Sequence, residues 1–306
     1  MMFRVEPDVN DFTIFTAPKP FTNPHINIIQ RNAIRSWLHL GEDVEVILVG
    51  EEAGLAEAAS ELGVTHLPNV ERNQWGTPLV SSIFGLARQH SAASLLCYVN
   101  ADILLMPDVV EAARRVKAQA SQFLLIGRRW NLDVIKPLYF PASWPEMLRA
   151  RTFRQGRLHP PAGSDYFIFP RHLYTDLPPF AIGRAGWDNW MIYHARQQGW
   201  PAIDATPDVM IVHQNHEYSH LGGEPHYDHE ESLINVKLAR GPENNYTGYM
   251  VLDTNKELRG GKMVPPRPTL LRAIRRAELA IMPKEKRGAR WALTRRLRKL
   301  RRRLIG

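Results

Sequence analysis

The fold of this chain is decided by the stretch LLCYVNADILL, residues 95–105. It is an apolar run rich in Leu, Val, Ile and Tyr, a composition that predicts a buried β-strand. One carboxylate, Asp102, lies within the run, and burying a carboxylate without a partner is costly. We therefore expect the strand to end near Asp102 and to present it, two residues after Asn100, to a ligand or a cation. The alternative is a turn aspartate that caps the next helix.

Strand-like and helix-like patterns alternate on both sides of this stretch. The predicted strands cover residues 12–17, 44–49, 123–126, 165–169 and 209–212, and the predicted helices cover 24–40, 51–62, 78–89, 107–120 and 187–198. Residues 128–158 mix aromatic, proline and basic residues and indicate a long loop region, and residues 222–261 are polar and irregular. The alternation predicts an α/β fold with a mainly parallel central sheet and helices on both faces.

Bulk composition restricts the class of protein. The chain has 306 residues, of which 44% are hydrophobic and 23% charged, as in globular proteins. Cys97 is the single cysteine, so no internal disulfide can form. No run approaches the roughly 20 apolar residues of a membrane-spanning helix, and the N-terminus lacks the apolar core of a signal peptide. We expect a cytoplasmic protein, or one that is peripheral to a membrane.

The net charge of +8 is unevenly distributed. Residues 267–306 carry 15 basic residues against two acids, a net charge of +13, whereas residues 1–266 carry a net charge of −5. The proline-rich segment 265–268 indicates a boundary between a domain at 1–265 and a basic tail at 266–306. Within the domain, we expect a nucleotide-binding half near 10–127 and an acceptor-binding, catalytic half near 128–265.

The basic tail has two apolar stripes at helical spacing. They comprise Leu270, Ile274, Ala277 and Ile281, and then Leu293, Leu297, Leu300 and Leu304, with a break at Pro283 and Gly288 between them. Basic helices with an apolar stripe bind anionic membrane surfaces, which is the interpretation we favour for residues 267–306. A disordered basic arm, a nucleic-acid arm and a docking helix for a protein partner are the alternatives.

Three segments combine residues that are typical of a catalytic site. They are Asn100–Asp102, the stretch GRAGWDNW at 183–190, and the stretch VHQNHEYSH at 212–220. Asp188 lies at a helix start and His213 directly follows a late strand, so two carboxylates and an imidazole are expected at element ends. Such a set suits group transfer from a nucleotide diphosphate, with a divalent cation at the diphosphate and a carboxylate as base.

Each of these residues also has a structural interpretation. Asp188 can be a helix N-cap, and His213 can be a histidine satisfied by backbone groups. The other histidines of this region are interpreted as surface or loop residues, although spacing alone leaves a zinc site open: His216, His220, His226 and His229.

The order of these segments resembles a glycosyltransferase of the GT-A fold, family 2-like, over residues 10–220. Such enzymes have a Rossmann-like α/β fold and an Asp-x-Asp motif that binds Mn²⁺ or Mg²⁺ and the sugar nucleotide. Asn100-Ala101-Asp102 departs from that motif at its first position. The resemblance therefore implies that Asp102 is the metal ligand of the triplet, and that Asn100 binds a ribose or a metal-bound water.

The resemblance also implies roles for further residues. The nucleobase would be surrounded by Phe15, Thr16, Ala17 and Glu51, and the nucleotide would be contacted by Arg72, Asn73, Thr77, Asn100, Ala101 and Asp102. The sugar or the acceptor would meet Asp165, Trp187 and Asn189. Asp188 would be the catalytic base of an inverting enzyme, and His213 would complete the metal site.

The leading hypothesis is a metal-dependent glycosyltransferase that moves a sugar from a nucleotide-diphosphate donor to a hydroxyl of a glycan or a lipid-linked acceptor. Its expected setting is cell-surface polysaccharide or glycolipid synthesis at the cytoplasmic face of a membrane. A metal-dependent nuclease or phosphohydrolase with a basic nucleic-acid arm is one alternative, although the acidic body argues against a nucleic-acid partner. A non-catalytic partner subunit of the same fold is the other. Glycine-rich dinucleotide-binding and P-loop motifs are absent from the sequence.

Overall fold

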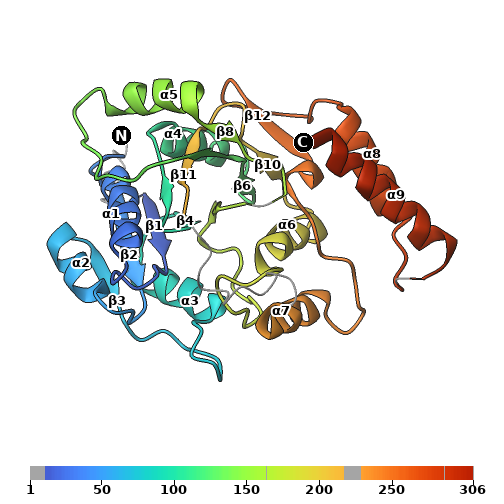
Figure 1. Ribbon diagram of the computed structural model, residues 1–306, viewed down its shortest axis with the longest axis horizontal. Coiled ribbons are helices and arrows are strands. Elements are labelled where there is room, and N and C mark those ends of the chain that lie inside the picture. The colour runs from blue at the N-terminus through green and yellow to red at the C-terminus, as the bar shows by residue number, and fades with distance from the viewer. Residues whose placement is uncertain (1–10, 163, 217–228, 286, 306) are drawn as a thin grey trace, which may run out of the picture.

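The computed structural model describes residues 11–162, 164–216, 229–285 and 287–305. Within these ranges, a nine-stranded sheet has the order β13-β12-β10-β6-β9-β4-β1-β2-β3, and a four-stranded sheet has the order β5-β11-β7-β8 (Figure 1). The strands are β1 Phe12–Thr16, β2 Val44–Val49, β3 Thr65–Leu67, β4 Leu95–Val99, β5 Ile103–Leu104, β6 Leu124–Ile126, β7 Arg129–Leu132, β8 Arg157–Leu158, β9 Tyr166–Pro170, β10 Ala202–Asp204, β11 Ile211–Gln214, β12 Lys256–Arg259 and β13 Lys262–Val264.

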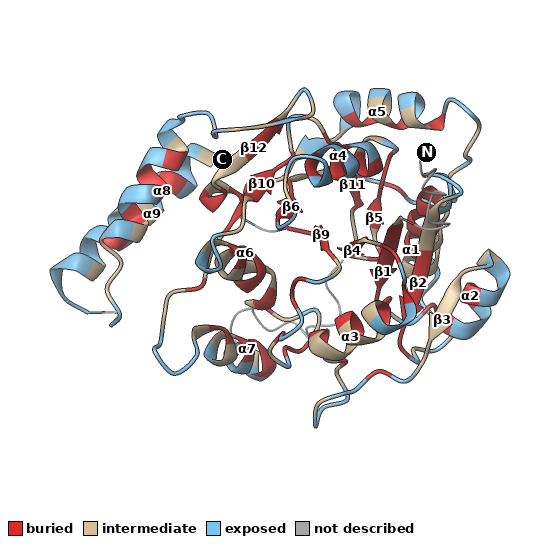
Figure 2. Cartoon of the chain, turned by 180° about the vertical axis from the view of Figure 1, so that it is seen from behind, coloured by how far each residue is buried: buried red, intermediate tan, exposed pale blue. Residues whose placement is uncertain are grey.

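The helices connect these strands and cover both faces of the nine-stranded sheet. They are α1 Pro24–Leu38, α2 Leu55–Leu62, α3 Val80–His90, α4 Asp108–Lys117, α5 Trp144–Gln155, α6 Trp187–Gln197, α7 Glu230–Arg240, α8 Leu270–Ala280 and α9 Gly288–Ile305, with a 3₁₀ turn η2 at Val251–Asp253. One core contains side chains of α1, α2 and α4, and the other contains side chains of α3, α6 and α7. Because both faces are covered, the central strands are buried along their whole length (Figure 2).

The predicted fold class is confirmed by the strand pairing. β1 pairs in parallel with β2 and β4, β2 with β3, and β10 with β6 and β12. β9 lies antiparallel between β4 and β6, and β13 is antiparallel to β12. The sheet is therefore mainly parallel, and the C-terminal extension is helical, as expected.

The prediction of a long loop at 128–158 is wrong, because β7, α5 and β8 lie there. Helix α5 buries Trp144 and Leu148 but leaves Met147 and Phe153 exposed, so its sequence lacks a continuous apolar stripe. Similarly, the polar segment 222–261 contains α7 and β12. Short strands, and helices whose apolar residues do not share one face, give little hydrophobic periodicity, so the sequence pattern did not predict these elements.

The stretch 95–105 proves to be two strands rather than one. β4 belongs to the nine-stranded sheet, and β5 pairs antiparallel with β11 in the four-stranded sheet. A turn separates them, closed by a hydrogen bond from the Ile103 amide to the Asn100 carbonyl at 3.1 Å. The Trp37 indole of α1 donates to the Ile103 carbonyl at 2.9 Å and holds the start of β5. Asp102 therefore lies where the chain passes from one sheet to the other.

Helices α8 and α9 pack against each other and hold to the domain through buried charges (Figure 1). Arg272 pairs with Asp204 of β10 at 3.0 Å, and Arg275 pairs with Asp253 of η2 at 2.7 Å. Glu278 is fully buried and joins α8 to α9: its carboxylate lies 3.1 Å from Arg275, 2.9 Å from Arg298 and 3.0 Å from Arg301. The charged side of α8 thus faces inward.

Replacing Glu278 with Gln is expected to destabilise the fold by about 3 kcal/mol, because it leaves buried guanidinium groups without a counter-charge. Burial alone would raise the pKa of Glu278, but the arginines lower it below its ordinary value of 4.5. The ionised Glu278 carboxylate therefore stabilises the fold above pH 4.5, and this stabilisation is lost as the pH falls through the lowered pKa. Urea unfolding at pH 7 and pH 4 measures both effects. Glu285→Gln, in an exposed pair with Arg287, is the matched control, and equal unfolding midpoints for the two variants would contradict the prediction.

Candidate active site

A cavity of about 770 Å³ lies at the edge of the sheet where β1 and β4 end. It is lined by most of the residues that the sequence predicts: Ala17, Arg72, Thr77, Asn100, Ala101, Asp102, Asp165, Trp187, Asp188 and His213. The carboxyl edge of parallel strands is the usual ligand site of such sheets. The predicted residues come from distant parts of the chain, so their meeting in one cavity indicates a functional site.

Five other predicted residues do not line this cavity. Phe15 is fully buried in the core against Phe84, and Thr16 is buried in β1. Glu51 is exposed, and its neighbour Glu52 lines the cavity instead. The Asn73 side chain shapes its own loop by accepting from the Trp75 and Thr77 amides, and Asn189 donates to the Tyr249 carbonyl at 2.6 Å.

Asn100 and Asp165 are brought together by antiparallel pairing. Val99 of β4 lies opposite Tyr166 of β9, so the residue that follows β4 meets the residue that precedes β9. Asn100 Nδ2 donates to Asp165 Oδ1 at 3.0 Å, and Asn100 Oδ1 accepts from the Tyr98 hydroxyl at 3.2 Å. The Asn100 amide, expected to bind a ribose or a metal-bound water, thus also orients Asp165.

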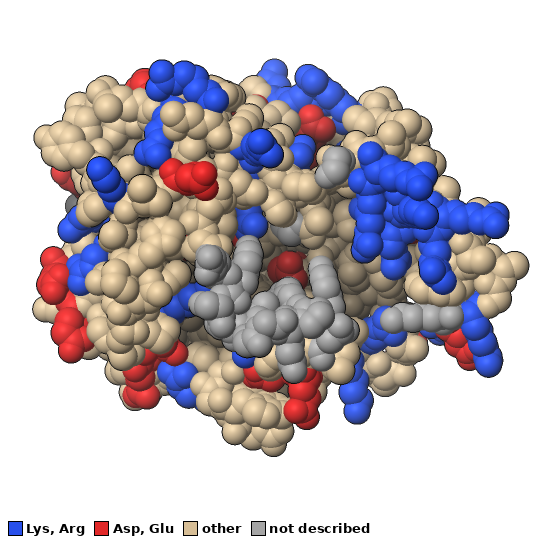
Figure 3. Space-filling model, in the orientation of Figure 1, with Lys and Arg blue, Asp and Glu red and all other residues tan. Residues whose placement is uncertain are grey.

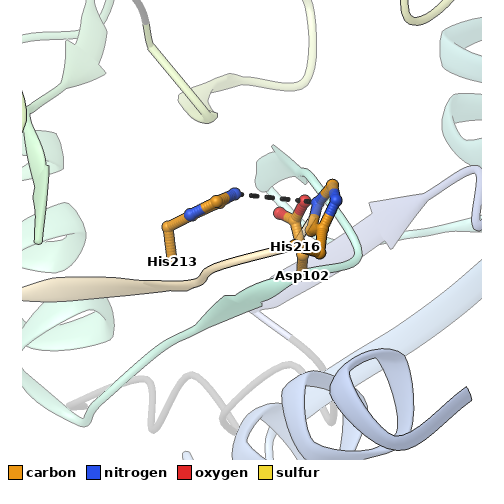
Figure 4. Close-up of side chains that lie close together, drawn as sticks. All are labelled: Asp102, His213 and His216. Atoms are coloured by element: carbon orange, nitrogen blue, oxygen red, sulfur yellow. Dashed lines mark hydrogen bonds and ion pairs between the residues drawn. The ribbon is translucent and has the colours of Figure 1, made fainter. Parts of the chain in front are cut away.

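The clearest feature of the cavity is a cluster of Asp102, His213 and His216 (Figure 4). His213 on β11 lies opposite Ile103 of β5, which places it beside Asp102. The Asp102 Oδ2 atom is 3.5 Å from His213 Nε2 and 2.8 Å from His216 Nε2. One ligand atom from each residue lies within 4.8 Å of the others, a spacing that can hold a metal ion.

The electrostatics of Asp102 fit a cation. Burial alone would raise the pKa of its carboxyl, but the hydrogen bonds and charge of His213 and His216 hold the pKa well below its usual range. Among the described residues, Asp102 Oδ1 and His213 Nδ1 are buried without a hydrogen-bond partner. Unpaired buried polar atoms are costly, and a bound ion would satisfy the carboxylate oxygen. Two imidazoles and a carboxylate form a suitable donor set for a divalent transition metal.

His216 was placed among the surface or loop histidines by sequence reasoning, and the structure instead places it in this cluster. Its ring Nε2 contacts the Asp102 carboxylate, and the side chain is almost fully buried. The available signal was the His-x-x-His spacing at the end of a late strand. His229, in contrast, caps α7 by accepting from the Glu231 amide, as a structural histidine does. Gly163, His220 and His226 lie outside the described residues.

Positive charge surrounds the rest of the cavity, which is lined by Lys19, Arg72, Arg129 and Arg184. Arg72 lies 3.0 Å from Glu52 and donates to the Gly76 carbonyl at 2.8 Å, and Arg129 pairs with Asp165. These contacts fix the guanidinium groups in direction. Fixed guanidinium groups suit phosphate oxygens, as expected for Arg72.

Asp188 occupies the first turn of α6, after Gly186, whose φ of 109° strongly favours glycine. Burial raises the pKa of its carboxyl to about 6, and the charge of Asp165 adds to the increase, although backbone hydrogen bonds oppose it. A carboxylate with a pKa near neutrality is a suitable general base. The neighbouring Trp187 lines the cavity while packing edge-on against Tyr98, at 5.1 Å between ring centroids.

His159 also lines the cavity, and sequence reasoning missed it. Burial lowers its pKa to about 4, and the charge of Arg129 adds to the shift, so the ring is neutral at pH 7. Its Nδ1 lies 3.2 Å from Asn131 Nδ2, which fixes the ring orientation. No sequence pattern marks His159, because its contact with the site depends on the pairing of β7 with β8.

No protein-family model matches the chain, and no curated protein matches it. Among solved structures, it is similar to the mannosyltransferase PcManGT from Pyrobaculum calidifontis in complex with GDP-Man and Mn²⁺, with 16% identity and a TM-score of 0.44 over 69% of this chain and 59% of that chain. It is also similar to glucosyl-3-phosphoglycerate synthase from Mycobacterium tuberculosis in complex with Mn²⁺, UDP and glucosyl-3-phosphoglycerate, with 14% identity and a TM-score of 0.46 over 85% and 88% of the two chains.

Both solved structures are glycosyltransferases, the class that the sequence resembles. This chain spans only 59% of the mannosyltransferase, and the TM-scores are below 0.5. Structural similarity at this level does not assign an activity to this chain, so its function is inferred from the geometry and chemistry of the cavity.

Proposed function

We propose that this protein is a metal-dependent glycosyltransferase that transfers a sugar from a nucleotide-diphosphate donor to a hydroxyl group. One observation carries the proposal: the Asp102–His213–His216 cluster and the raised-pKa carboxylate of Asp188 line one cavity with fixed arginines. Transfer from a sugar diphosphate requires ligands for a divalent cation, cationic groups near the diphosphate and a general base.

Asp102, His213 and His216 would hold the metal. Mn²⁺ suits this set better than Mg²⁺ does, because imidazole ligands suit transition metals and Mg²⁺ prefers oxygen ligands. When bound, such an ion offsets the charge of a diphosphate leaving group. Arg72 adds a guanidinium group with a fixed direction to the same cavity.

Asp188 would accept the proton of the acceptor hydroxyl. The base would thereby activate the hydroxyl for direct attack on the sugar, and a single displacement inverts the anomeric centre. Asp165 would contact the donor sugar or the acceptor; it is held by Asn100 and Arg129 and therefore has a defined orientation. Trp187 lines the cavity but is only 5% exposed, so the small accessible part of its ring would contact the sugar.

We further propose that the acceptor is a glycan or a lipid-linked sugar, and that the enzyme acts in cell-surface polysaccharide or glycolipid synthesis. The basic extension α8–α9 supports a peripheral position on the cytoplasmic face of a membrane. Among the helices that the structure describes, none is long and apolar enough to cross a bilayer.

A calorimetric screen of nucleotide sugars with Mn²⁺ tests the proposal. At least one uridine- or guanosine-diphosphate sugar is expected to bind with a dissociation constant between about 1 µM and 1 mM, the usual range for enzyme substrates. The same titration with EDTA should show binding that is at least tenfold weaker. If no nucleotide sugar binds in the presence of Mn²⁺, the donor assignment is wrong, and a non-catalytic role gains support.

A further inference from the structure

The C-terminal hairpin, α8 and α9, buries several charged side chains and exposes four of its leucines. The side chains that it buries include Arg272, Arg275, Glu278 and Arg301. Meanwhile Leu293, Leu300 and Leu304 of α9 are 48%, 45% and 47% exposed, and Leu270 of α8 is 65% exposed. An ordinary surface helix shows the opposite arrangement, with its apolar stripe toward the core.

The three leucines of α9 form one stripe along the helix. Leu293, Leu300 and Leu304 are spaced by seven and four residues, so they point to the same side. The helix has eight basic residues and no acid. Arg298 and Arg301 turn inward to Glu278, and the other six basic residues are exposed. At 3.6 residues per turn, Arg290, Arg296 and Arg303 flank the leucine stripe, whereas Arg295, Lys299 and Arg302 point to the other side of the helix.

The inward-facing ion pairs explain why the stripe faces outward. Glu278 holds α9 through Arg298 and Arg301, and α8 holds to the domain through Arg272 and Arg275. Turning the leucines toward the domain would break these pairs and leave buried charges unpaired, which is strongly unfavourable. The orientation of the leucine stripe is therefore fixed by the folded domain.

We propose that this face of α9 binds the surface of an anionic lipid bilayer, with Leu293, Leu300 and Leu304 inserted between lipids and the three flanking basic residues, Arg290, Arg296 and Arg303, at the headgroups. The charges are complementary to anionic lipids, and the leucines supply the apolar contact. A nucleic acid would satisfy the charges only, because its phosphate backbone gives the exposed leucines no apolar surface to contact. The proposal deepens the membrane position given above and does not depend on transferase activity.

The placement of this surface suits an acceptor held in the membrane. In Figure 3 a dense cluster of basic side chains lies over the α8–α9 hairpin, on the same face of the molecule as a central hollow that shows acidic atoms. A bilayer that contacts the basic cluster would therefore adjoin the face with this hollow. An enzyme docked in this way could receive a lipid-linked acceptor without extracting it from the bilayer.

The experiment is co-sedimentation of the full chain with vesicles of phosphatidylcholine alone and of phosphatidylcholine mixed with phosphatidylglycerol. Wild-type protein is expected to bind only the anionic vesicles. A triple variant, Leu293→Ser, Leu300→Ser and Leu304→Ser, is expected to bind them at least tenfold more weakly. Replacing Arg290, Arg296 and Arg303 with Gln should weaken binding about fivefold per charge removed.

Two controls separate the outcomes. Leu38→Ser changes a leucine of α1 that is 39% exposed and should leave vesicle binding unchanged. The urea unfolding midpoint should be the same in wild type and in the leucine variant, so loss of vesicle binding is not confused with loss of fold, and Mn²⁺-dependent hydrolysis of the sugar donor without vesicles should also be unchanged. Unchanged vesicle binding by the leucine variant would overturn the proposal, as would tight duplex-DNA binding together with no binding to anionic vesicles.

Discussion

Replacing Asp102 with Asn is expected to lower metal-dependent turnover of the sugar donor by about a thousandfold, equivalent to roughly 4 kcal/mol. The substitution keeps the shape of the side chain but removes the one negative charge of the cluster with His213 and His216. Binding of Mn²⁺, followed by its electron paramagnetic resonance signal, should weaken in parallel. Donor hydrolysis at saturating Mn²⁺ measures the remaining effect on rate.

The controls for Asp102→Asn distinguish the metal site from general damage. Asp43→Asn removes an exposed carboxylate that pairs with Arg114 and should leave both Mn²⁺ affinity and turnover unchanged. His216→Ala should weaken Mn²⁺ binding by at least about tenfold, because a direct nitrogen ligand is lost and even an outer-shell partner is worth about 10- to 100-fold. Undiminished Mn²⁺ affinity in both cluster variants would show that the ion binds elsewhere.

Replacing Asp188 with Asn is expected to lower the rate of sugar transfer by about 10²- to 10⁴-fold, the usual contribution of a general base. Binding of the nucleotide sugar should stay within about threefold of wild type, since Asp188 is not part of the metal cluster. Single-turnover transfer to an acceptor and calorimetry with the sugar donor measure the two effects. Loss of donor binding in this variant would reassign Asp188 to the donor site.

The pH dependence of transfer should report the same carboxylate. Burial raises the pKa of Asp188 to about 6, so the basic form is lost as pH falls through that value. We expect the wild-type rate to fall about tenfold per pH unit below 6 and the residual rate of Asp188→Asn to lack this limb. Asp176→Asn, at an exposed bend residue, should keep the wild-type profile.

The raised pKa also has a consequence for stability. A carboxyl whose pKa is higher in the folded than in the unfolded state destabilises the fold once pH rises above both values. Asp188→Asn removes this cost, so its melting temperature at pH 7 should equal or exceed that of wild type. A clear decrease would indicate that the Asp188 carboxylate supports α6 rather than serving as a base.

The sequence by itself determined the fold class and the centre of the site. Continuous apolar runs such as 44–49 and 95–99 match buried strands because both faces of the sheet are covered. The costly carboxylate at Asp102 and the acid at a helix start, Asp188, were recognised from local patterns alone. Asp102 lies in the cavity because β4 ends at the carboxyl edge of the parallel strands. Asp188 reaches the same cavity by another route, since α6 follows the antiparallel strand β9 and residues 171–186 carry the chain back to this edge.

Only the tertiary structure decided which side chains meet. Asp165 reaches Asn100, and His213 reaches Asp102, through antiparallel pairings between segments that are far apart in sequence. His216 joins the cluster from beyond a strand end, where periodicity carries no signal. The choice of Glu52 over Glu51 likewise depends on which way a loop residue points.

In the C-terminal hairpin, too, the sequence predicts the helices but the tertiary structure decides which face they bury. The spacing of its leucines predicted helices, and those helices are present. Which face they bury was decided by Asp204, Asp253 and Glu278, whose buried carboxylates hold arginines inward and so turn the leucines outward. Spacing along the chain therefore fixes the apolar stripe, but the direction of the stripe follows from charge pairs that exist only in the folded protein.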